Sequence, residues 1–529
     1  MISHAGGEDL GMDRDAVSGE AVSTRPTNPP AKPLRGEARA VPLATRAMPR
    51  ELTTYMAQFR RVFGRLETFE NACSYVTGLL SDLPRKNGEK TAEAIEGIPN
   101  TEMVHRLMAL SPWSAEELDR LRVHHAVACA TSGDVEGALI LDEVSQLKQG
   151  RLSVGVKRQY LGCEGKTANG QVSVTAHYSD GLFDWPVTGR LYLPEDWTKD
   201  AERRDKAGVP KEITFATKGE IALALVQRAQ EWMVPFRWVL MDAGYDDLHT
   251  LATLADKGLC FCIGVKRDFM VRVPEEIERW VPPPQPPRRG RPRLRPDPRS
   301  MPSVYRVDEL LAGLPDSLWR PVTYRQGTAR PLTKEFAALR VQCATTTHMG
   351  PDVWLLFERS MAGDGPVKHY VLYADRELAL DELAQVAHRR PLIERNSYEN
   401  GKGEVGLRDY QGRSWLGFHH HLSLAMLALT WLNLQRQPLP PRESPPPAPG
   451  ATAALAPTVE VELPDRDQPL CFTVAQPSAT DLSPPRQRWE SVQEVRRRFV
   501  AWCALTVQAA LARRGGALPV PTFVPLCGP

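Results

Sequence analysis

Hydrophobic positions near the start of the chain recur at the spacing of helices. Residues such as Tyr55, Phe59 and Leu66 fit a turn of three to four positions, whereas the first 48 residues mix Gly, Pro, Arg and Asp without a period. A period close to 3.6 predicts amphipathic helices, and a polar stretch without one predicts a tail. We therefore expect a tail at residues 1–48 and an all-helical N-terminal domain at residues 49–132.

The next pattern is that of a β-hairpin followed by a third strand. An apolar run at Ala138–Leu141 leads into Asp142, and polar and apolar residues alternate from Gln171 to Tyr178. This alternation predicts two paired strands with Asp142 where the first strand leaves the core, then a third strand at about residues 182–194. An acidic residue at that point either faces water or offers oxygen ligands to a divalent cation.

A unit of strand, helix and strand comes after the hairpin. Thr217 is a candidate N-cap for a helix at about residues 218–232, and the apolar segment 237–242 ends in Asp242. A short helix and a further strand at residues 259–266 follow. Parallel strands joined through a helix form a right-handed βαβ unit. Asp242 is therefore expected at the carboxyl end of a buried strand, where open α/β sheets place their chemistry.

Strand patterns return later in the chain and are followed by a proline-rich segment. We expect an α/β domain at residues 133–436 that contains a β-rich insertion at about residues 268–378. Residues 437–488 are rich in Pro and Ala and predict a linker. Residues 489–529 include a basic amphipathic helix and form a C-terminal helical segment.

Composition excludes several classes of protein. The chain has 529 residues, and 66 basic side chains nearly balance 64 acidic ones, so a nucleic-acid partner would have to be met by local basic groups. The nine cysteines are scattered, with no zinc-site spacing and no disulfide framework. The first residues lack the regions of a signal peptide, and the most apolar helix, Leu422–Leu434, is too short to span a bilayer. These features predict a soluble intracellular protein without a membrane partner.

Three basic groups are candidate DNA contacts. Residues 281–300 contain eight prolines and six arginines, and their core with Arg289, Arg291 and Arg293 resembles an Arg-Gly-Arg-Pro element of the narrow minor groove; a plain basic loop is the alternative. The other two groups are Lys157 with Arg158, and the sequence PRKN at residues 84–87. Each of these either contacts phosphate or is a solvated surface charge.

Six segments in a fixed order resemble DDE-type insertion-sequence transposases with an RNase H-like core, most closely the insertion sequence 701 family. Such a collinear set is more specific than any one motif. The segments are LDE at 141–143, SVGVKRQYLGCEGKTANGQVSV at 153–174, RLYLPEDW at 190–197, FATK at 215–218, VPFRWVLMDAGYDD at 234–247 and IERNSYENGKGEVGLRDYQGRSW at 393–415.

The resemblance implies a fold, a metal site and three catalytic acids. The fold would be an RNase H-like mixed sheet with flanking helices and a β-rich insertion before the last catalytic helix. Asp142, Asp242 and Glu394 would hold two Mg²⁺ or Mn²⁺ ions. Two dications about 4 Å apart repel each other, so their ligands must be anionic.

The surroundings of Glu394 match the family in part. Arg390 stands one helical turn before Glu394 and is expected to neutralise a phosphate or pair with the carboxylate. Lys402 resembles a lysine that binds DNA near the cleaved bond, but it lies eight residues after Glu394, one more than the family pattern. Ala387 stands where the family has a tyrosine, and Pro391 where it has a tryptophan.

The extra residue leaves two readings of the third acid. Either a bulge absorbs it, or Glu394 is not a ligand and Glu404 or Glu399 takes its place. Glu143 and Asp246 are interpreted as supporting or solvent-facing acids.

Three consecutive histidines, His419, His420 and His421, look like a metal cluster. Consecutive helical residues point in different directions, so they are poorly placed to share one ion. Contact with phosphate or a surface location is the expectation.

The predicted function is a transposase that uses metal ions to cut DNA at element ends and joins those ends to a target, which is cut-and-paste transposition. The family implies a homodimer on paired inverted-repeat ends, in the bacterial cytoplasm and associated with the nucleoid. Two alternatives remain: a catalytically inactive or domesticated DNA-binding protein, and a nuclease that does not join strands. Binding without metal-dependent cutting would mark the first, and cutting without joined product the second.

Overall fold

The computed structural model describes residues 43–44, 48–96, 101–132, 136–281, 301–326, 331–390, 399–436, 438–439, 458–461, 470–476 and 488–512. Glu394 and the arginines Arg289, Arg291 and Arg293 lie outside the described residues, as do nearly all of the predicted tail and much of the predicted linker.

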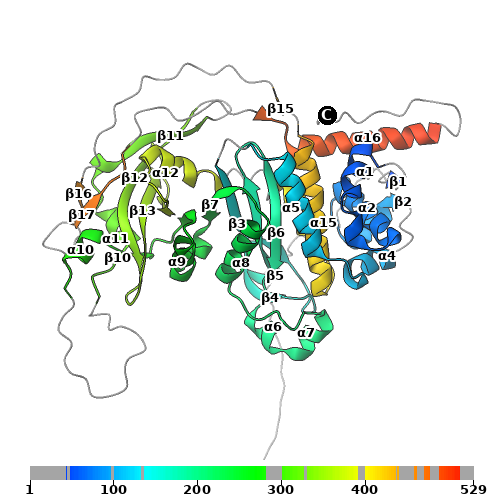
Figure 1. The fold of residues 1–529 in the computed structure, drawn as a ribbon, viewed down its shortest axis with the longest axis horizontal. Coiled ribbons are helices and arrows are strands. Elements are labelled where there is room, and N and C mark those ends of the chain that lie inside the picture. Colours follow the sequence, from blue (N-terminus) through cyan, green and yellow to red (C-terminus); the bar gives the residue numbers. More distant parts are fainter. Residues whose placement is uncertain are drawn as a thin grey trace, which may run out of the picture. The chain divides into compact units, whose positions relative to one another are not determined.

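Five strands toward one end of a 12-stranded mixed sheet carry the predicted core (Figure 1). Strand β3 pairs antiparallel with β5, and β5 antiparallel with β6. On the other side, β7 is parallel to β3 and β8 is parallel to β7. The predicted hairpin, the third strand and the βαβ unit are therefore confirmed, and together they make the expected RNase H-like sheet. The strands are β3 (Gly137–Leu147), β5 (Lys166–Ser179), β6 (Asp184–Leu191), β7 (Phe236–Met241) and β8 (Cys260–Gly264).

The apolar run of β3 is buried on both faces of the sheet. Leu139 and Leu141 belong to one hydrophobic cluster with α8 (Lys218–Glu231) and α9 (Leu248–Asp256), whereas Ala138 and Ile140 belong to a second one with α15 (Trp415–Leu434). Successive side chains of a strand point to opposite faces, so helices on both sides require a continuous apolar run.

The predicted helix after Thr217 is confirmed together with its cap. The Thr217 hydroxyl accepts from the amide of Glu220 at 3.2 Å, and the Glu220 carboxylate accepts from the amide of Thr217 at 2.7 Å. This reciprocal pair satisfies two amides at the start of α8.

The strands of the predicted insertion extend the same sheet. β14 (Lys368–Tyr373) pairs antiparallel with β8, then β13 (Met349–Arg359) and β12 (Pro331–Ala344) follow outward, with β9 (Met270–Arg272) beyond them. Strand β4 (Lys157–Leu161), which the hydrophobic pattern did not predict, pairs with the start of β5.

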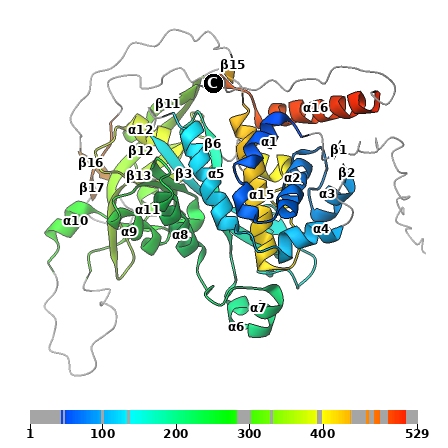
Figure 2. The same ribbon diagram turned by 45° about the vertical axis from the view of Figure 1, so that its right-hand side comes forward.

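Helices of the N-terminal part pack around α15 (Figures 1 and 2). α1 (Arg50–Ala57) and α2 (Leu66–Leu80) fit the predicted helical spacing, and α5 (Ala115–Cys129) lies beside both α15 and β6. α15 is buried on nearly all sides, which explains why its sequence is apolar without a polar face. Within the described residues, no helix is both long and apolar enough to cross a membrane.

Shorter elements complete the described part, together with the C-terminal helix α16 (Val492–Ala512). They are β1 (Leu43–Ala44), η2 (Arg60–Phe63), α3 (Gly88–Ala94), β2 (Ile95–Glu96), α4 (Thr101–His105), η3 (Arg106–Leu110), α6 (Glu195–Lys199), α7 (Ala201–Ala207), η4 (Ala243–Tyr245), α10 (Pro274–Arg279), β10 (Tyr305–Arg306), α11 (Val307–Ala312), η6 (Asp316–Leu318), β11 (Arg320–Gln326), α12 (Leu380–Ala387), α14 (Glu399–Glu404), β15 (Pro438–Leu439), β16 (Thr458–Val461), β17 (Leu470–Thr473) and β18 (Arg488–Trp489).

Candidate functional site

Asp142 and Asp242 come from neighbouring parallel strands. Ile140 of β3 lies opposite Leu240 of β7, and each aspartate follows two residues later. Residues two apart on a strand share a face, and Ile140 and Leu240 lie in the same hydrophobic cluster. The two carboxylates therefore extend from one side of the sheet at the same level.

Arg390 joins these carboxylates. Its Nη2 lies 3.4 Å from Oδ2 of Asp142 and 3.9 Å from Oδ2 of Asp242. The other oxygens are held by backbone amides: Glu143 donates to Oδ1 of Asp142 at 2.7 Å, and Gly244 donates to Oδ1 of Asp242 at 2.8 Å. Each aspartate thus has one oxygen fixed by the backbone and one that faces the shared cation.

The position of Asp142 within its strand corrects one expectation. β3 does not end there but continues to Leu147, and residues 144–146 are buried again. The reason is that the pairing with β5 runs on to Gly170, so the strand remains covered beyond the acidic residues. Asp142 and Glu143 are half-buried positions in the middle of a long strand.

The electrostatics of Asp142 are those of a carboxylate largely removed from water. Burial raises the pKa of Asp142 from 3.8 to about 6; Arg390 lowers it and the charge of Asp242 raises it. The amide of Glu143 and the ammonium of Lys402 also lower this pKa, so Lys402 is within electrostatic reach of Asp142. A proton and a divalent cation would compete for this carboxylate near neutral pH.

Neighbouring acids are held in ion pairs of their own. Glu143 lies 2.7 Å from Nζ of Lys218, the first residue of α8, and Asp246 lies 2.7 Å from Nζ of Lys266. Sequence reasoning missed both lysines as partners, because nothing in their local pattern shows which acid they meet. These ion pairs agree with the interpretation of Glu143 and Asp246 as acids that support the site.

Among the described side chains, no third acid joins Asp142 and Asp242. The Glu404 carboxylate, one of the two substitutes for Glu394, accepts from the Arg496 guanidinium of α16 and is therefore committed elsewhere. Nothing is described for the side chains of Glu394 and Glu399. Across the described ranges, no three His, Cys, Asp or Glu side chains form a group that could hold a metal ion. The Asp142 and Asp242 oxygens themselves fit a divalent cation, since hard cations prefer oxygen ligands and the pair is anionic.

The predicted DNA contacts outside this centre are separate from it. Lys157 pairs with Asp196 at 3.0 Å, and Arg158 is exposed on β4. Arg158 lies opposite Asn169 of β5, whereas Asp142 lies opposite Thr175. Six residues along a strand span roughly 20 Å, so these charges could contact only DNA that extends beyond the carboxylates.

The basic corner at PRKN is not as exposed as expected. Lys86 is only 2% exposed, and its amide donates to Asp409 at 2.9 Å. Its ammonium group donates to the backbone carbonyl of Ser81, and burial lowers the pKa of Lys86 to about 8, although Glu404, Asp82 and Asp409 favour its charged form. Lys86 is therefore a structural residue, and Arg85 alone remains an exposed cation of this corner.

The three histidines of α15 are not on the surface. Both ring nitrogens of His420 lie 2.8 Å from backbone carbonyls, those of Met108 and Trp113, and its ring stacks on Trp113 at 3.7 Å. His421 contacts the Tyr75 hydroxyl at 2.8 Å. The expectation of a phosphate or surface role is wrong for these two, which instead join α15 to the N-terminal helices. His419 is partly buried and lies 2.9 Å from the carbonyl of Trp415.

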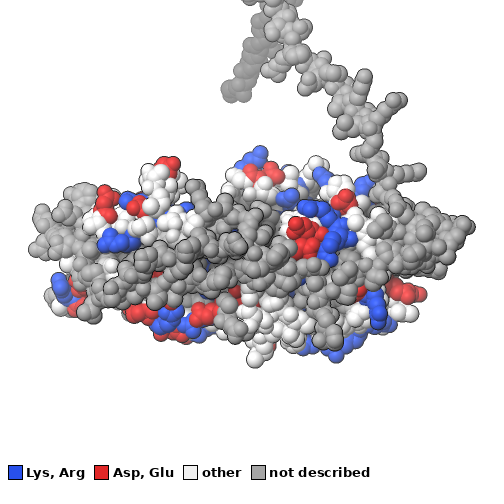
Figure 3. Space-filling view, turned by 90° about the horizontal axis from the view of Figure 1, so that it is seen from above, with Lys and Arg blue, Asp and Glu red and all other residues white. Residues whose placement is uncertain are grey.

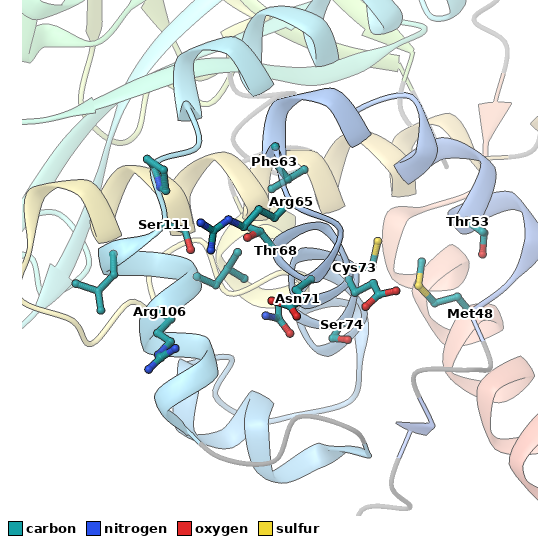
Figure 4. Close-up of a pocket in the computed structure, with 16 residues that line it drawn as sticks. Met48, Thr53, Phe63, Arg65, Thr68, Asn71, Cys73, Ser74, Arg106 and Ser111 are labelled. Atoms are coloured by element: carbon teal, nitrogen blue, oxygen red, sulfur yellow. The ribbon is translucent and has the colours of Figure 1, made fainter.

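A pocket among the N-terminal helices has neither aspartate in its lining. It has a volume of about 1330 Å³ and is lined by residues of α2 and η3, including Arg106, and by Arg65 just before α2 (Figure 4). Glu67 and Glu70 also line it, so its charge is mixed. On the face shown in Figure 3, small groups of Lys and Arg likewise lie among Asp and Glu. Position and chemistry, rather than cavity size, therefore identify the candidate site.

A mixed sheet of this order, with two aspartates at the same level of its adjacent parallel strands, defines a nuclease-type α/β protein. A family model described as DDE superfamily endonuclease matches residues 58–331, about half of the chain, and the protein belongs to this family. Such endonucleases generally use divalent metal ions.

A curated relative supports the resemblance to insertion sequence 701. The probable transposase for insertion sequence element IS701 from Microchaete diplosiphon is 27% identical over 224 residues, which cover 41% of this chain and 54% of the relative. The chain thus matches about half the length of that relative. The match confirms the family resemblance drawn from the motifs.

Proposed function

We propose that the protein is a DNA transposase that cuts the ends of a mobile element and joins them to target DNA. The observation that carries the proposal is the convergence of Asp142 and Asp242 on Arg390. Membership of the DDE endonuclease family supplies the class of reaction. The match to a probable transposase favours strand joining over hydrolysis alone.

Asp142, Asp242 and Glu394 would be the ligands of two Mg²⁺ or Mn²⁺ ions. When bound, the ions would activate the attacking oxygen and stabilise the leaving one. The two aspartates contribute charge that neutral amides could not, since two dications at close range repel. Arg390 would release the Oδ2 atoms of Asp142 and Asp242 to the metal, and its guanidinium would then bind a phosphate of the DNA. Lys402 would hold the neighbouring phosphate.

Two successive displacements at phosphorus account for the strand that is cut and joined at each end. In the first, a water oxygen bonds to phosphorus while the bond to the 3′ oxygen breaks, which leaves a 3′-hydroxyl and a 5′-phosphate. In the second, that 3′-hydroxyl attacks a phosphodiester of the target and releases a new 3′-hydroxyl there. Each step breaks one P–O bond and forms one, so no further reactant is required.

The remaining parts would bind and pair the DNA ends. Residues 49–132 would form the helical DNA-binding domain, and the loop with Arg289, Arg291 and Arg293 would lie in the minor groove. Lys157 and Arg158 would contact phosphates at a distance from the cut. The working form would be a homodimer on inverted-repeat ends, associated with the bacterial nucleoid.

Cleavage of a supercoiled plasmid that carries the element ends tests the proposal. We expect Mg²⁺-dependent nicking by the wild-type protein and a loss of at least about 100-fold in Asp142→Asn and Asp242→Asn. Asp364→Asn is the matched control, because this acid is exposed in the turn between β13 and β14, away from the candidate DNA contacts in the sequence. Equal cutting by all four proteins would contradict the role of the aspartate pair.

A labelled target plasmid in the same reaction distinguishes a transposase from a simple nuclease. The proposal requires covalently joined product whose formation depends on a free 3′-hydroxyl at the element end. Cutting without any joined product would reduce the function to hydrolysis.

A further inference from the structure

The C-terminal helix α16 contacts the short helix α14, which carries Lys402. On α14, Asn400 and Glu404 are four residues apart and share a face, whereas Lys402 lies about 200° around the helix from each. Lys402 acts electrostatically on both Asp142 and His177, which lie on the central sheet. α14 therefore has one face toward the candidate site and another toward α16.

Two polar contacts join the helices, and we refer to them as the α14–α16 contact. Gln493 donates to the side-chain oxygen of Asn400 at 2.5 Å, and Arg496 donates to the carboxylate of Glu404. Asn400 is 4% exposed, and the side chains of Glu404 and Arg496 are 14% and 16% exposed. A charge pair so far removed from water is costly to leave with one member.

The same guanidinium also reaches the N-terminal helices. Nη1 of Arg496 lies 3.1 Å from the carbonyl oxygen of Ser81 and 3.1 Å from Oδ1 of Asp82, just after α2. One side chain thus links the end of α2, α14 and the C-terminal helix.

α16 is held in place by other contacts as well. Val495 and Phe499 are fully buried, and the Phe499 ring lies 5.5 Å from that of Trp431 in α15. Arg498 donates to the carbonyl of Gln435 at 3.1 Å. A change at Arg496 should therefore disturb α14 without releasing α16.

We propose that Arg496 and Glu404 are positioning residues for the DNA-cleaving site. The α14–α16 contact fixes the orientation of α14 so that Lys402 faces Asp142 and the scissile phosphate. This inference rests on the proposed function. It gives the C-terminal segment, which lies beyond the family match at residues 58–331, a part in assembling the centre.

Charge-reversal variants test the α14–α16 contact, because exchanging the two charges should restore what each single variant loses. Arg496→Glu and Glu404→Arg should each slow single-turnover plasmid cleavage by about 10- to 100-fold, because small displacements of a catalytic group cost that much. The cleavage rate of the double variant should recover to within about threefold of the wild type. Asp82 repels the new carboxylate at position 496 only weakly, because its side chain is 76% exposed. Arg497→Glu, an exposed neighbour on α16, is the control and should cleave normally.

Hydrogen exchange provides a readout that does not depend on cutting. The amides of α14 should exchange at least about tenfold faster in Arg496→Glu than in the wild type, and the double variant should restore protection. The amides of β3 should be unchanged in all variants. If the wild type does not cut DNA but exchange follows this pattern, the proposed function fails while the contact stands.

Two results would overturn the inference. One is normal cleavage by both single variants. The other is a double variant that keeps the fold and the protection of β3 but recovers neither cleavage nor the protection of α14.

Discussion

Replacing Asp142 with asparagine should make the metal-free protein more stable at neutral pH. Burial raises the pKa of the Asp142 carboxyl from 3.8 to about 6, so the ionised form is disfavoured in the folded state. Asparagine has a similar shape and carries no charge. The substitution therefore removes the electrostatic cost of burying an ionised carboxylate. The wild-type site bears this cost because an ionised carboxylate is the form that binds a cation.

The magnitude follows from the size of the pKa shift. One pKa unit corresponds to about 1.4 kcal/mol. A shift of about two units therefore means that the ionised carboxylate lowers the free energy of unfolding by up to ~3 kcal/mol. The Asp142 side chain is only 16% exposed, so solvent screens little of this cost. The interaction with Arg390 is already contained in the shifted pKa.

The stability gained by Asp142→Asn depends on pH. A carboxyl whose folded-state pKa is raised binds its proton more tightly in the folded protein, so its contribution to stability is present at low pH and lost as the pH rises through about 6. The advantage of Asp142→Asn should be full at about pH 8, reduced near pH 5 and absent below about pH 4.

Denaturation in EDTA, followed at several pH values, measures this advantage. Thermal midpoints should rise by a few degrees in Asp142→Asn at pH 8. Glu143→Gln is the matched control, because Glu143 is paired with Lys218 and its loss should not stabilise. A variant no more stable than the wild type at pH 8, or a gain that persists unchanged at pH 4, would mean that ionised Asp142 does not destabilise the fold.

Three further substitutions probe the site and its support. Arg390→Gln should raise the pKa of Asp142 further and move the pH midpoint of Mn²⁺ binding up by about one unit or more; an unchanged midpoint in calorimetric titrations would speak against the pairing. Arg122→Met should cost about 3–5 kcal/mol in urea unfolding, because Arg122 is fully buried and pairs with Asp119 at 3.0 Å. Adding Asp119→Asn should recover part of that loss, and no recovery would contradict the charge pairing. Thr217→Ala should cost about 1 kcal/mol through the lost cap of α8, whereas Thr217→Ser should cost little.

The elements that local pattern predicted well are those whose signals lie within the element itself. The alternation in β5 and the capping residues of α8 express forces between near neighbours, so the hydrophobic pattern was sufficient to identify them. β4 was missed because it is an edge strand whose residues are mostly exposed, as those of a loop are. The extension of β3 beyond Asp142 was missed because polar residues there are covered by β5, a partner that the local pattern does not identify.

Buried polar side chains were the main source of error. Lys86, His420 and His421 look like surface residues in sequence, but all three are buried. His420 and His421 contact a carbonyl and a hydroxyl of distant segments, and Lys86 contacts the carbonyl of Ser81 nearby in the chain. The pairing of Arg390 with Asp142 spans 248 residues and likewise depends on the tertiary fold. The resemblance to transposases identified the aspartates, and their geometry comes from the register of β3 and β7.

Binding of Mn²⁺ at pH 8 tests most directly whether Asp142 and Asp242 act together on a cation. Calorimetric titration of the wild type, Asp142→Asn, Asp242→Asn and the control Asp364→Asn requires neither DNA nor turnover. We expect Mn²⁺ binding by the wild type and the control, and an affinity at least about tenfold weaker in each of the other two variants. Equal Mn²⁺ affinity in all four proteins would contradict this expectation.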